Sequence, residues 1–208
     1  MRRIPSSPES PSLFLSFDDG PGPEMTPAVL DVLAEHDCKA TFFLVAKRAE
    51  RARDVVGRMI EAGHAIGNHS LDHTWTVFFR GPRAMLEWIA ESERRLQDLY
   101  GRETVGFRSP AGVRTPVLHW ALRELDIPLV HWNLRSFDRA HAWTEKRAMR
   151  ALDAAQPGSI VLLHDTHRAP HVEEFLRSLR TFLCEAKRRG FRFAPLHRRV
   201  VRAALREA

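Results

Sequence analysis

The sequence predicts an α/β fold in which helices cover a parallel sheet. Short apolar segments of strand length alternate with longer amphipathic segments along most of the 208 residues. Hydrophobic residues make up 44% of the chain and charged residues 28%, which is typical of a folded globular domain rather than a disordered or fibrous protein. About seven strand–helix units are expected, and they fit either an open doubly wound sheet or a barrel.

The first unit shows the pattern on which this interpretation depends. The apolar segment 12–17 is expected to be a strand that ends at a pair of aspartates. A helix over 27–36 follows, with Thr26 as its N-cap and Pro27 at its first helical position. A change from strand to helix within some 15 residues is what a β/α unit requires.

The remaining elements repeat this alternation, because short apolar runs are separated by segments with an apolar residue every three to four positions. Further strands are expected at 39–45, 64–67, 104–107, 127–134, 159–163 and 191–193. Further helices are expected at 48–62, 82–100, 115–125, 144–155, 171–189 and 197–206. None of the strands is followed by GxGxxG or GxxxxGK[ST], so neither a dinucleotide site nor a P-loop is indicated.

The net charge of +6 is concentrated at the C-terminal end of the chain. Residues 1–167 carry a net charge of −1, whereas residues 168–208 carry a net charge of +7. We interpret the basic stretch as a solvated helix face, and binding to nucleic acid is not expected. Peripheral contact of this tail with an anionic membrane is the alternative.

The cellular location and the role of the cysteines follow from two further features. No apolar run approaches the roughly 18 residues that a membrane span needs, and the N-terminal residues lack the apolar stretch of a secretory signal. A cytoplasmic location is therefore expected. Cys38 and Cys184 are too few for a disulfide framework, and we expect both to be buried as small apolar residues.

Polar side chains of the kinds used in catalysis follow five of the predicted strands. They are Asp18 and Asp19, His69 and His73, Arg108, Asp138, and His164. Because the carboxyl ends of parallel strands form one face of an α/β fold, these residues are expected to meet in one site.

The residue types at this site indicate a metal-dependent hydrolase. Two histidines four residues apart, together with a carboxylate, form a ligand set that suits zinc, iron, cobalt or manganese. Neighbouring residues on a strand point in opposite directions, so one of Asp18 and Asp19 can bind the metal while the other acts as a base. Arg108 would keep that base ionised, and His164 beside Asp138 is a candidate acid.

Five motifs stand in order over about residues 13–165: SFDDGPG at 16–22, HSLDH at 69–73, FRSPAG at 107–112, WNLRSFDR at 132–139 and IVLLHD at 160–165. Together they resemble the motifs of polysaccharide deacetylases of the NodB-homology type, carbohydrate esterase family 4. The resemblance implies a deformed (β/α) barrel with seven or eight parallel strands. It also implies a metal-dependent hydrolase that removes N-acetyl groups from an amino-sugar oligosaccharide or glycan precursor and releases acetate.

The resemblance further implies a role for each catalytic and metal-binding residue. Asp18 is the general base, Arg108 orients it, and His164 is the acid that Asp138 supports. One divalent metal, expected to be zinc with cobalt, nickel, iron or manganese as alternatives, is held by Asp19, His69 and His73.

The substrate-binding residues implied by the resemblance lie in the last three motifs. The backbone N–H of Ala111 is expected to hold the oxyanion, and Leu162 to line the pocket for the acetyl methyl group. Trp132 and Arg139 are expected to contact the substrate. An N-acetylated carbohydrate is therefore the expected partner.

The fourth motif departs from the family pattern at two positions. Arg135 stands where the family has Asp, and Arg139 stands where it has a Trp that forms one wall of the sugar groove. The two arginines add positive charge near the substrate, which favours an acidic or phosphate-bearing acceptor.

The resemblance divides the chain into an N-terminal extension (1–11), a NodB-homology deacetylase domain (12–196) and a basic helical tail (197–208). Two alternative functions remain open. One is a related C–N hydrolase, a deformylase or amidohydrolase, acting on a lipid-linked or small-molecule substrate. The other is a non-catalytic binder of glycans or anionic surfaces, although binding alone does not require the Asp18/His164 pair.

Overall fold

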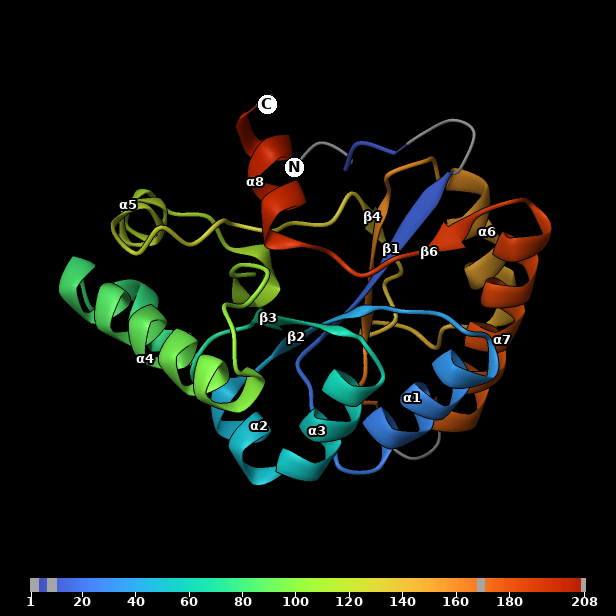
Figure 1. Cartoon of the computed structure of the whole chain (residues 1–208), viewed down its shortest axis with the longest axis horizontal. Coiled ribbons are helices and arrows are strands. Elements are labelled where there is room, and N and C mark those ends of the chain that lie inside the picture. Colours follow the sequence, from blue (N-terminus) through green and yellow to red (C-terminus); the bar gives the residue numbers. More distant parts are fainter. Residues whose placement is uncertain (1–3, 7–10, 168–170, 207–208) are drawn as a thin grey trace.

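The computed structural model describes residues 4–6, 11–167 and 171–206, and it shows one parallel sheet surrounded by helices (Figure 1). The strands are β1 (Ser12–Asp18), β2 (Thr41–Leu44), β3 (Ala65–Asn68), β4 (Leu134–Arg135), β5 (Ile160–His164) and β6 (Arg192–Phe193). Their order is β3-β2-β1-β5-β4, and β6 pairs with the start of β1. Each of these pairings is parallel, so the predicted α/β architecture is confirmed.

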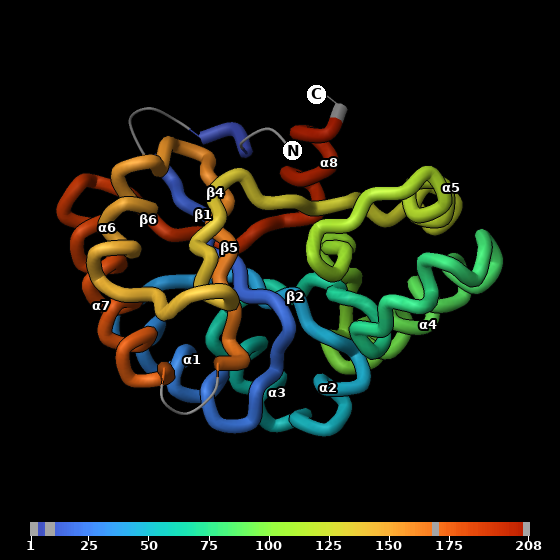
Figure 2. Tube along the Cα trace, turned by 180° about the vertical axis from the view of Figure 1, so that it is seen from behind, coloured from blue at the N-terminus to red at the C-terminus, as the bar shows by residue number. Residues whose placement is uncertain are grey.

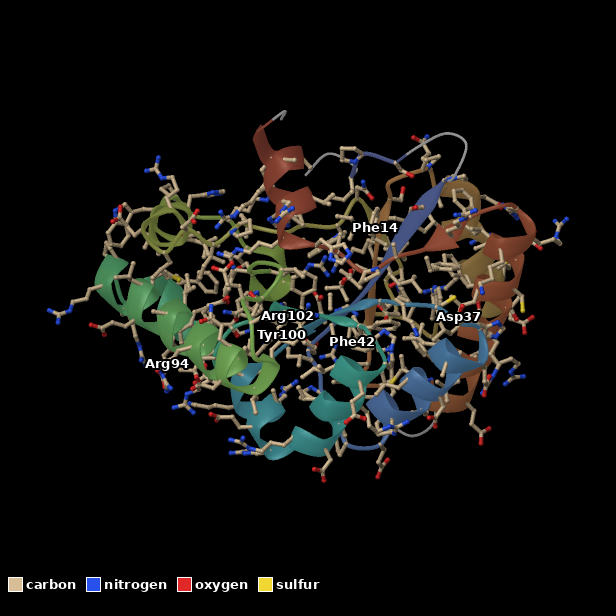
Figure 3. All side chains as sticks on the ribbon, in the orientation of Figure 1. Phe14, Asp37, Phe42, Arg94, Tyr100 and Arg102 are labelled. Carbon is tan, nitrogen blue, oxygen red and sulfur yellow. The ribbon has the colours of Figure 1, made fainter. Side chains whose placement is uncertain are left out.

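Helices surround the sheet on several sides. They are α1 (Met25–Glu35), α2 (Ala46–Arg51), α3 (Arg53–Glu61), α4 (Pro82–Tyr100), α5 (Pro116–Glu124), α6 (Glu145–Ala154), α7 (Val172–Arg188) and α8 (Arg198–Arg206), with short 3₁₀ turns η1 (Thr76–Phe79) and η2 (Pro110–Gly112). In Figure 1, α1, α6 and α7 lie to the right of the sheet, α2 and α3 below it, and α4 and α5 to its left. Figure 3 shows Arg94 projecting away from α4, where it pairs with Glu91 and Asp98.

Two of the expected strands, 104–107 and 127–134, are largely irregular. Only isolated parallel bridges remain there, Asn68 to Phe107 and Phe107 to Leu129. Gly106 has a φ of 143°, and a Cβ on it would lie 2.5 Å from the carbonyl oxygen of Pro128, which itself has no N–H to donate. Phe107 thus bridges to Asn68 at the end of β3 and to Leu129, and the segment that follows Leu129 leads into β4, which pairs with β5.

Two helix predictions were also wrong in detail. The expected helix 48–62 is broken into α2 and α3 at Ala52, which has φ −126° and ψ 46°. Thr26 is not an N-cap, because α1 already begins at Met25. The Thr26 hydroxyl instead accepts a hydrogen bond from the Gly22 N–H and donates one to Asp165.

The cysteine prediction holds for one residue only. Cys38 is buried, whereas Cys184 is exposed. Cys184 lies on α7, whose buried stripe is formed by Phe175, Ser178, Leu179, Phe182, Leu183 and Ala186. Its position in the helix turns it away from that stripe.

Alternate residues of strand β1 lie on opposite sides of the sheet. Leu13, Leu15 and Phe17 pack in the main core cluster, where Phe17 stacks on Phe42 with ring centres 5.0 Å apart. The alternate residues, beginning with Phe14 in a second cluster, point to the opposite side of the strand. Asp18 belongs to this second set.

The two ends of the described chain pack against the domain. Ile4 is buried and shares an apolar cluster with Val201 and Ala204 of α8, and its N–H donates to the Gly158 carbonyl at 2.9 Å. Figure 2 shows α8 beside this N-terminal segment. The boundaries after residues 11 and 196 remain predictions, and residues 1–3, 7–10 and 207–208 of the two flanking segments lie outside the described residues. In the described part of the chain, no helix combines the length and the apolar character that crossing a membrane requires.

Candidate active site

The predicted catalytic residues meet where four neighbouring parallel segments end. Asp18 is the last residue of β1, and it lies opposite His164 of β5 in the sheet register. His69 directly follows β3, and Arg108 directly follows the bridge residue Phe107. The parallel order therefore brings residues that are up to 146 positions apart to one edge of the sheet.

Arg108 and Asp18 form a buried ion pair. The Nη1 of Arg108 lies 2.7 Å from Asp18 Oδ1 and also donates to the Ser16 hydroxyl at 2.7 Å. Ser16 and Asp18 are two residues apart on β1 and therefore share one side of the strand. The Arg108 side chain is fully buried, with its Cζ 3.8 Å from the centre of the Phe43 ring. This packing fixes the direction of the Asp18 carboxylate.

Asp19, His69 and His73 present three convergent ligand atoms. Asp19 Oδ1 lies 3.2 Å from His69 Nε2 and 3.1 Å from His73 Nε2, and the three ligand atoms lie within 4.8 Å of one another. The Nδ1 of His69 lies 2.8 Å from the Arg108 carbonyl, to which it would donate, leaving Nε2 as the metal-binding nitrogen. Burial alone would raise the pKa of Asp19, but hydrogen bonds from the two histidines outweigh it and hold that pKa well below its ordinary value. The arrangement fits a divalent metal with two imidazole ligands and one carboxylate ligand.

The backbone is strained where it presents these ligands. Asp19, Ser70 and His73 all have positive φ values, of 73°, 88° and 62°. The Ser70 N–H is held by Asn68 Oδ1 at 2.8 Å, and the His73 N–H by the Ser70 hydroxyl at 3.0 Å. Non-glycine residues in this conformation cluster at functional sites, because the surrounding structure must offset their strain.

His164 lies across the site and is held by Asp138. Its Nδ1 is 2.8 Å from Asp138 Oδ1, and its backbone N–H donates to Oδ2 at 2.8 Å. Burial would lower the pKa of His164, but the hydrogen bond and negative charge of Asp138 outweigh it and raise that pKa. Burial would raise the pKa of Asp138, yet its hydrogen bonds from His164 and His167 lower that pKa below the ordinary range.

His167 is a residue that the sequence analysis did not assign. Its Nε2 lies 3.1 Å from Asp138 Oδ2, so the carboxylate is shared between two imidazoles. The ring of His167 also packs on Phe175, with ring centres 4.8 Å apart. In the sequence, only its position three residues after His164 could have indicated that His167 belongs to the site.

Asp165 supports the loop that carries the two catalytic aspartates. It is fully buried, and its carboxylate accepts a hydrogen bond from Thr26 at 2.6 Å. A Cβ on Gly20 would lie 2.5 Å from both carboxylate oxygens, so only glycine fits beside it. Burial raises the pKa of Asp165 from its ordinary value of 3.8 to about 7.

We expect this buried carboxyl to make stability depend on pH. Because folding raises the pKa of Asp165, its stabilising contribution is complete below about pH 4 and is lost as the pH rises to about 7. Asp165→Asn, which cannot ionise, should lack this dependence. As the pH rises from 4 to 7, the wild type should therefore lose stability relative to Asp165→Asn. Urea unfolding across this range measures it, and a constant difference would contradict the prediction.

The expected substrate-binding residues border the same edge of the sheet. Ala111 lies exposed in η2 with φ 49°, and its N–H donates to no acceptor within the described part of the chain. Leu162 is buried in β5. Trp132 is half-buried, and its ring lies so close to Gly112 that a Cβ there would be 2.7 Å from it. The third and fourth motifs therefore form a continuous wall.

Two exposed aromatic side chains near the site were not predicted. Trp75 is 48% exposed, and its ring meets the His73 ring edge-on with centres 6.3 Å apart. Phe137 is 54% exposed and lies under Arg135, whose Cζ is 5.0 Å from the ring centre. Both aromatics offer an apolar face at the rim, of the kind on which a sugar ring can pack.

The two unusual arginines of the fourth motif have different surroundings. Arg135 packs on Phe137, as described above, and is exposed. Arg139 instead reaches the metal-binding residues, because its Nη2 lies 3.4 Å from Asp19 Oδ2. The expected contact of Arg139 with substrate is therefore placed directly beside a predicted metal ligand.

The chain is similar to known deacetylases in sequence. The polysaccharide deacetylase family profile matches residues 6–130. A chitooligosaccharide deacetylase of Azorhizobium caulinodans is 33% identical over 155 residues, which cover 74% of this chain and 73% of that protein. A peptidoglycan-N-acetylglucosamine deacetylase of Bacillus cereus is 32% identical over 183 residues, which cover 88% of this chain and 66% of that protein.

Solved structures with this fold point to the same group. A peptidoglycan N-acetylglucosamine deacetylase bound to a benzamide compound superposes with a TM-score of 0.81 at 30% identity, covering 92% of this chain and 88% of that one. A family 4 acetyl xylan esterase from Clostridium thermocellum, in complex with a cobalt ion, has a TM-score of 0.78 at 31% identity. The match covers 88% of this chain and 87% of that one. With a family match over more than half its length and these relatives, the chain belongs to the polysaccharide deacetylase family.

Proposed function

We propose that this protein is a metal-dependent N-deacetylase that removes acetyl groups from an amino-sugar oligosaccharide or glycan precursor. The observation that carries the proposal is the joint geometry of the site: Asp18 fixed by Arg108, the Asp19–His69–His73 cluster beside it, and the His164–Asp138 pair opposite. The relatives that are chitooligosaccharide and peptidoglycan N-acetylglucosamine deacetylases support the same reaction.

Asp19, His69 and His73 fit a divalent metal, and we propose zinc. Such a metal, when bound, would polarise the acetyl carbonyl and lower the pKa of a coordinated water. A structure of one relative contains a cobalt ion, so cobalt is an alternative to test. The cytoplasmic location and any contact of the basic tail with a membrane remain predictions.

The protein's own residues divide the proton transfers between two sides of the site. Asp18 would accept the proton of the attacking water, since Arg108 keeps its carboxylate in place. The Ala111 N–H would hold the oxyanion that develops on the acetyl oxygen. The negative charge of Asp138 favours the protonated form of His164, which would give its proton to the leaving amine. The products are acetate and a free amino sugar.

Acetate release tests this proposal directly. Zinc-loaded protein would be incubated with chitooligosaccharides, peptidoglycan fragments, a lipid-linked N-acetylhexosamine and an N-formyl amino sugar, with Asp18→Asn as the blank. Release of acetate by the wild type alone is the expected result. Release of formate alone would favour the deformylase alternative. No release from protein shown to bind one metal and the glycan would favour the non-catalytic binder.

The pH profile tests the acid role of His164. We expect Asp138→Asn to move the alkaline limb of kcat/KM to lower pH, because the variant loses the negative charge that raises the pKa of His164. Activity should fall as the pH rises through that lowered pKa. Asp153→Asn, which removes a carboxylate from a surface ion pair with Arg189, is the matched control and should leave the profile unchanged. An unshifted limb in Asp138→Asn would exclude His164 as the titrating acid.

A further inference from the structure

Arg139 is held at the opening of the site by two neighbours. Its Nη2 lies 3.4 Å from Asp19 Oδ2, and its Nη1 donates to the Thr166 hydroxyl at 3.1 Å. Half of the side chain, 51%, nevertheless remains exposed. A guanidinium has five N–H donors, so several of them are available to a ligand at this opening.

A second arginine contacts the backbone of the same aspartate. Arg48 donates from Nη1 to the backbone carbonyl of Asp19 at 2.6 Å. Arg48 and Arg51 line a cavity of about 520 Å³. Arg139 lines a second cavity, of about 360 Å³, and Thr166 and His167 belong to the walls of both. The two cavities are therefore adjacent, and each brings an arginine to Asp19.

The carboxylate paired with Arg139 is Asp19, which is also a predicted metal ligand. Asp138, in the wall of the smaller cavity, is buried and occupied by His164 and His167. Of the residues that the structure describes, Glu24 is the only acid in the wall of the larger one. Among the described residues, no carboxylate lies within ion-pair distance of Arg48 or Arg51. Any divalent metal on Asp19 would add more positive charge and repel Arg139.

With a divalent metal on Asp19, a neutral glycan would bring no further negative charge to balance Arg139 and the metal. An apolar aromatic wall would suit an uncharged sugar ring. A guanidinium at the same place instead matches the oxygens of a carboxylate or phosphate group, which it can bind through two parallel hydrogen bonds.

We infer that this site takes an anionic amino sugar, whose carboxylate or phosphate group binds Arg139 at the Thr166 side of the metal-binding cluster. Arg48 adds to the positive potential there but contacts Asp19 rather than the ligand. The inference rests on the proposed deacetylase function and specifies its substrate class. Arg139 acts as a specificity residue, because it would bind the anionic group of the substrate and not the acetyl group that is removed.

Binding to protein that cannot turn over tests the inference apart from activity. The zinc-loaded Asp18→Asn variant would be titrated with three disaccharides: di-N-acetylchitobiose, its 1-phosphate, and N-acetylglucosaminyl-N-acetylmuramic acid. We expect at least one of the two anionic disaccharides to bind about tenfold more tightly than the neutral one, as one charge-assisted hydrogen-bond pair allows. The better of the two identifies the anion as phosphate or carboxylate.

Substitution of Arg139 decides whether this residue is the cause. Adding Arg139→Gln to the Asp18→Asn protein should remove the preference and leave the affinity for the neutral disaccharide within about twofold. Arg139→Trp should also remove the preference, and its apolar ring should favour the neutral disaccharide. Arg188→Gln, at an exposed arginine of α7 paired with Glu185, is the matched control and should keep the preference. The preference should also weaken as the salt concentration rises.

Two results would overturn the inference. One is equal affinity for the neutral and both anionic disaccharides. The other is a preference that survives in both Arg139 variants. Neither result would contradict the proposed deacetylase function, which fails only if the wild-type enzyme releases no acetate from any substrate. A wild type that deacetylates neutral and anionic disaccharides equally, with equal binding, would leave the deacetylase and exclude the anionic specificity.

Discussion

Replacement of Asp18 by Asn is expected to lower kcat by about 10²–10⁴-fold, the usual contribution of a general base. Asn has nearly the shape of Asp and can still accept the hydrogen bond from Arg108 through its amide oxygen, but it cannot take the proton of the attacking water. The metal ligands Asp19, His69 and His73 are unchanged. Metal content should therefore remain at the wild-type value while turnover is lost.

The loss must be separated from damage to the fold. Arg108 is fully buried and would be left facing a neutral amide, so some destabilisation is expected. Thermal unfolding and metal analysis of Asp18→Asn show whether the protein is folded and loaded under the assay conditions. Asp31→Asn, which removes the carboxylate partner of Arg58 on the surface, should keep full activity. Turnover near the wild-type rate in Asp18→Asn would rule out Asp18 as the base.

The sequence predicted those site residues that stand at the ends of strands. Asp18, His69, Arg108 and His164 each follow a short apolar run, and the parallel order of those runs brings them together. This works because the direction of a strand and the end at which it stops are local properties of the chain. The expectation that the residues share one edge then follows from the fold class alone.

The strand prediction was wrong where the backbone departs from a regular ladder. Residues 104–107 and 127–134 have the apolar composition of strands, yet Gly106 approaches the Pro128 carbonyl too closely for a regular pairing. This approach depends on two segments that are 22 residues apart, so a local pattern does not reveal it. The N-cap assigned to Thr26 failed for the same reason, because Asp165, far along the chain, takes its hydroxyl.

The contacts between side chains across the site could not be predicted from the sequence either. The bond of His167 to Asp138 depends on the turn that follows β5, and the approach of Arg139 to Asp19 depends on where the segment after β4 crosses the opening. The sequence showed that Arg135 and Arg139 are unusual, but only the structure distinguishes them. One packs on Phe137, and the other reaches the metal-binding cluster.

Removal of one metal ligand is expected to have the second of the two largest effects. His69→Ala should lower metal affinity by more than about 100-fold, since even the loss of a hydrogen-bond partner of a ligand commonly costs 10–100-fold. His69 is buried, and its Nδ1 is anchored on the Arg108 carbonyl, so its Nε2 is held in a fixed position beside Asp19. Activity and metal content should fall together, in contrast to Asp18→Asn, in which activity alone falls.

Zinc-dependent stabilisation measures the lost site without using activity. A metal that binds only the folded state raises the unfolding temperature, so zinc should stabilise the wild type and Asp18→Asn but not His69→Ala. His119→Ala, at an exposed histidine of α5, controls for the loss of an imidazole elsewhere. If His69→Ala kept one tightly bound zinc, Asp19 and His73 would have to bind it with another ligand, and the assignment of His69 would be wrong. If zinc stabilises the wild type and Asp18→Asn alike and leaves His69→Ala unchanged, the base and the metal site are two separable functions of adjacent aspartates, one paired with Arg108 and the other with His69 and His73.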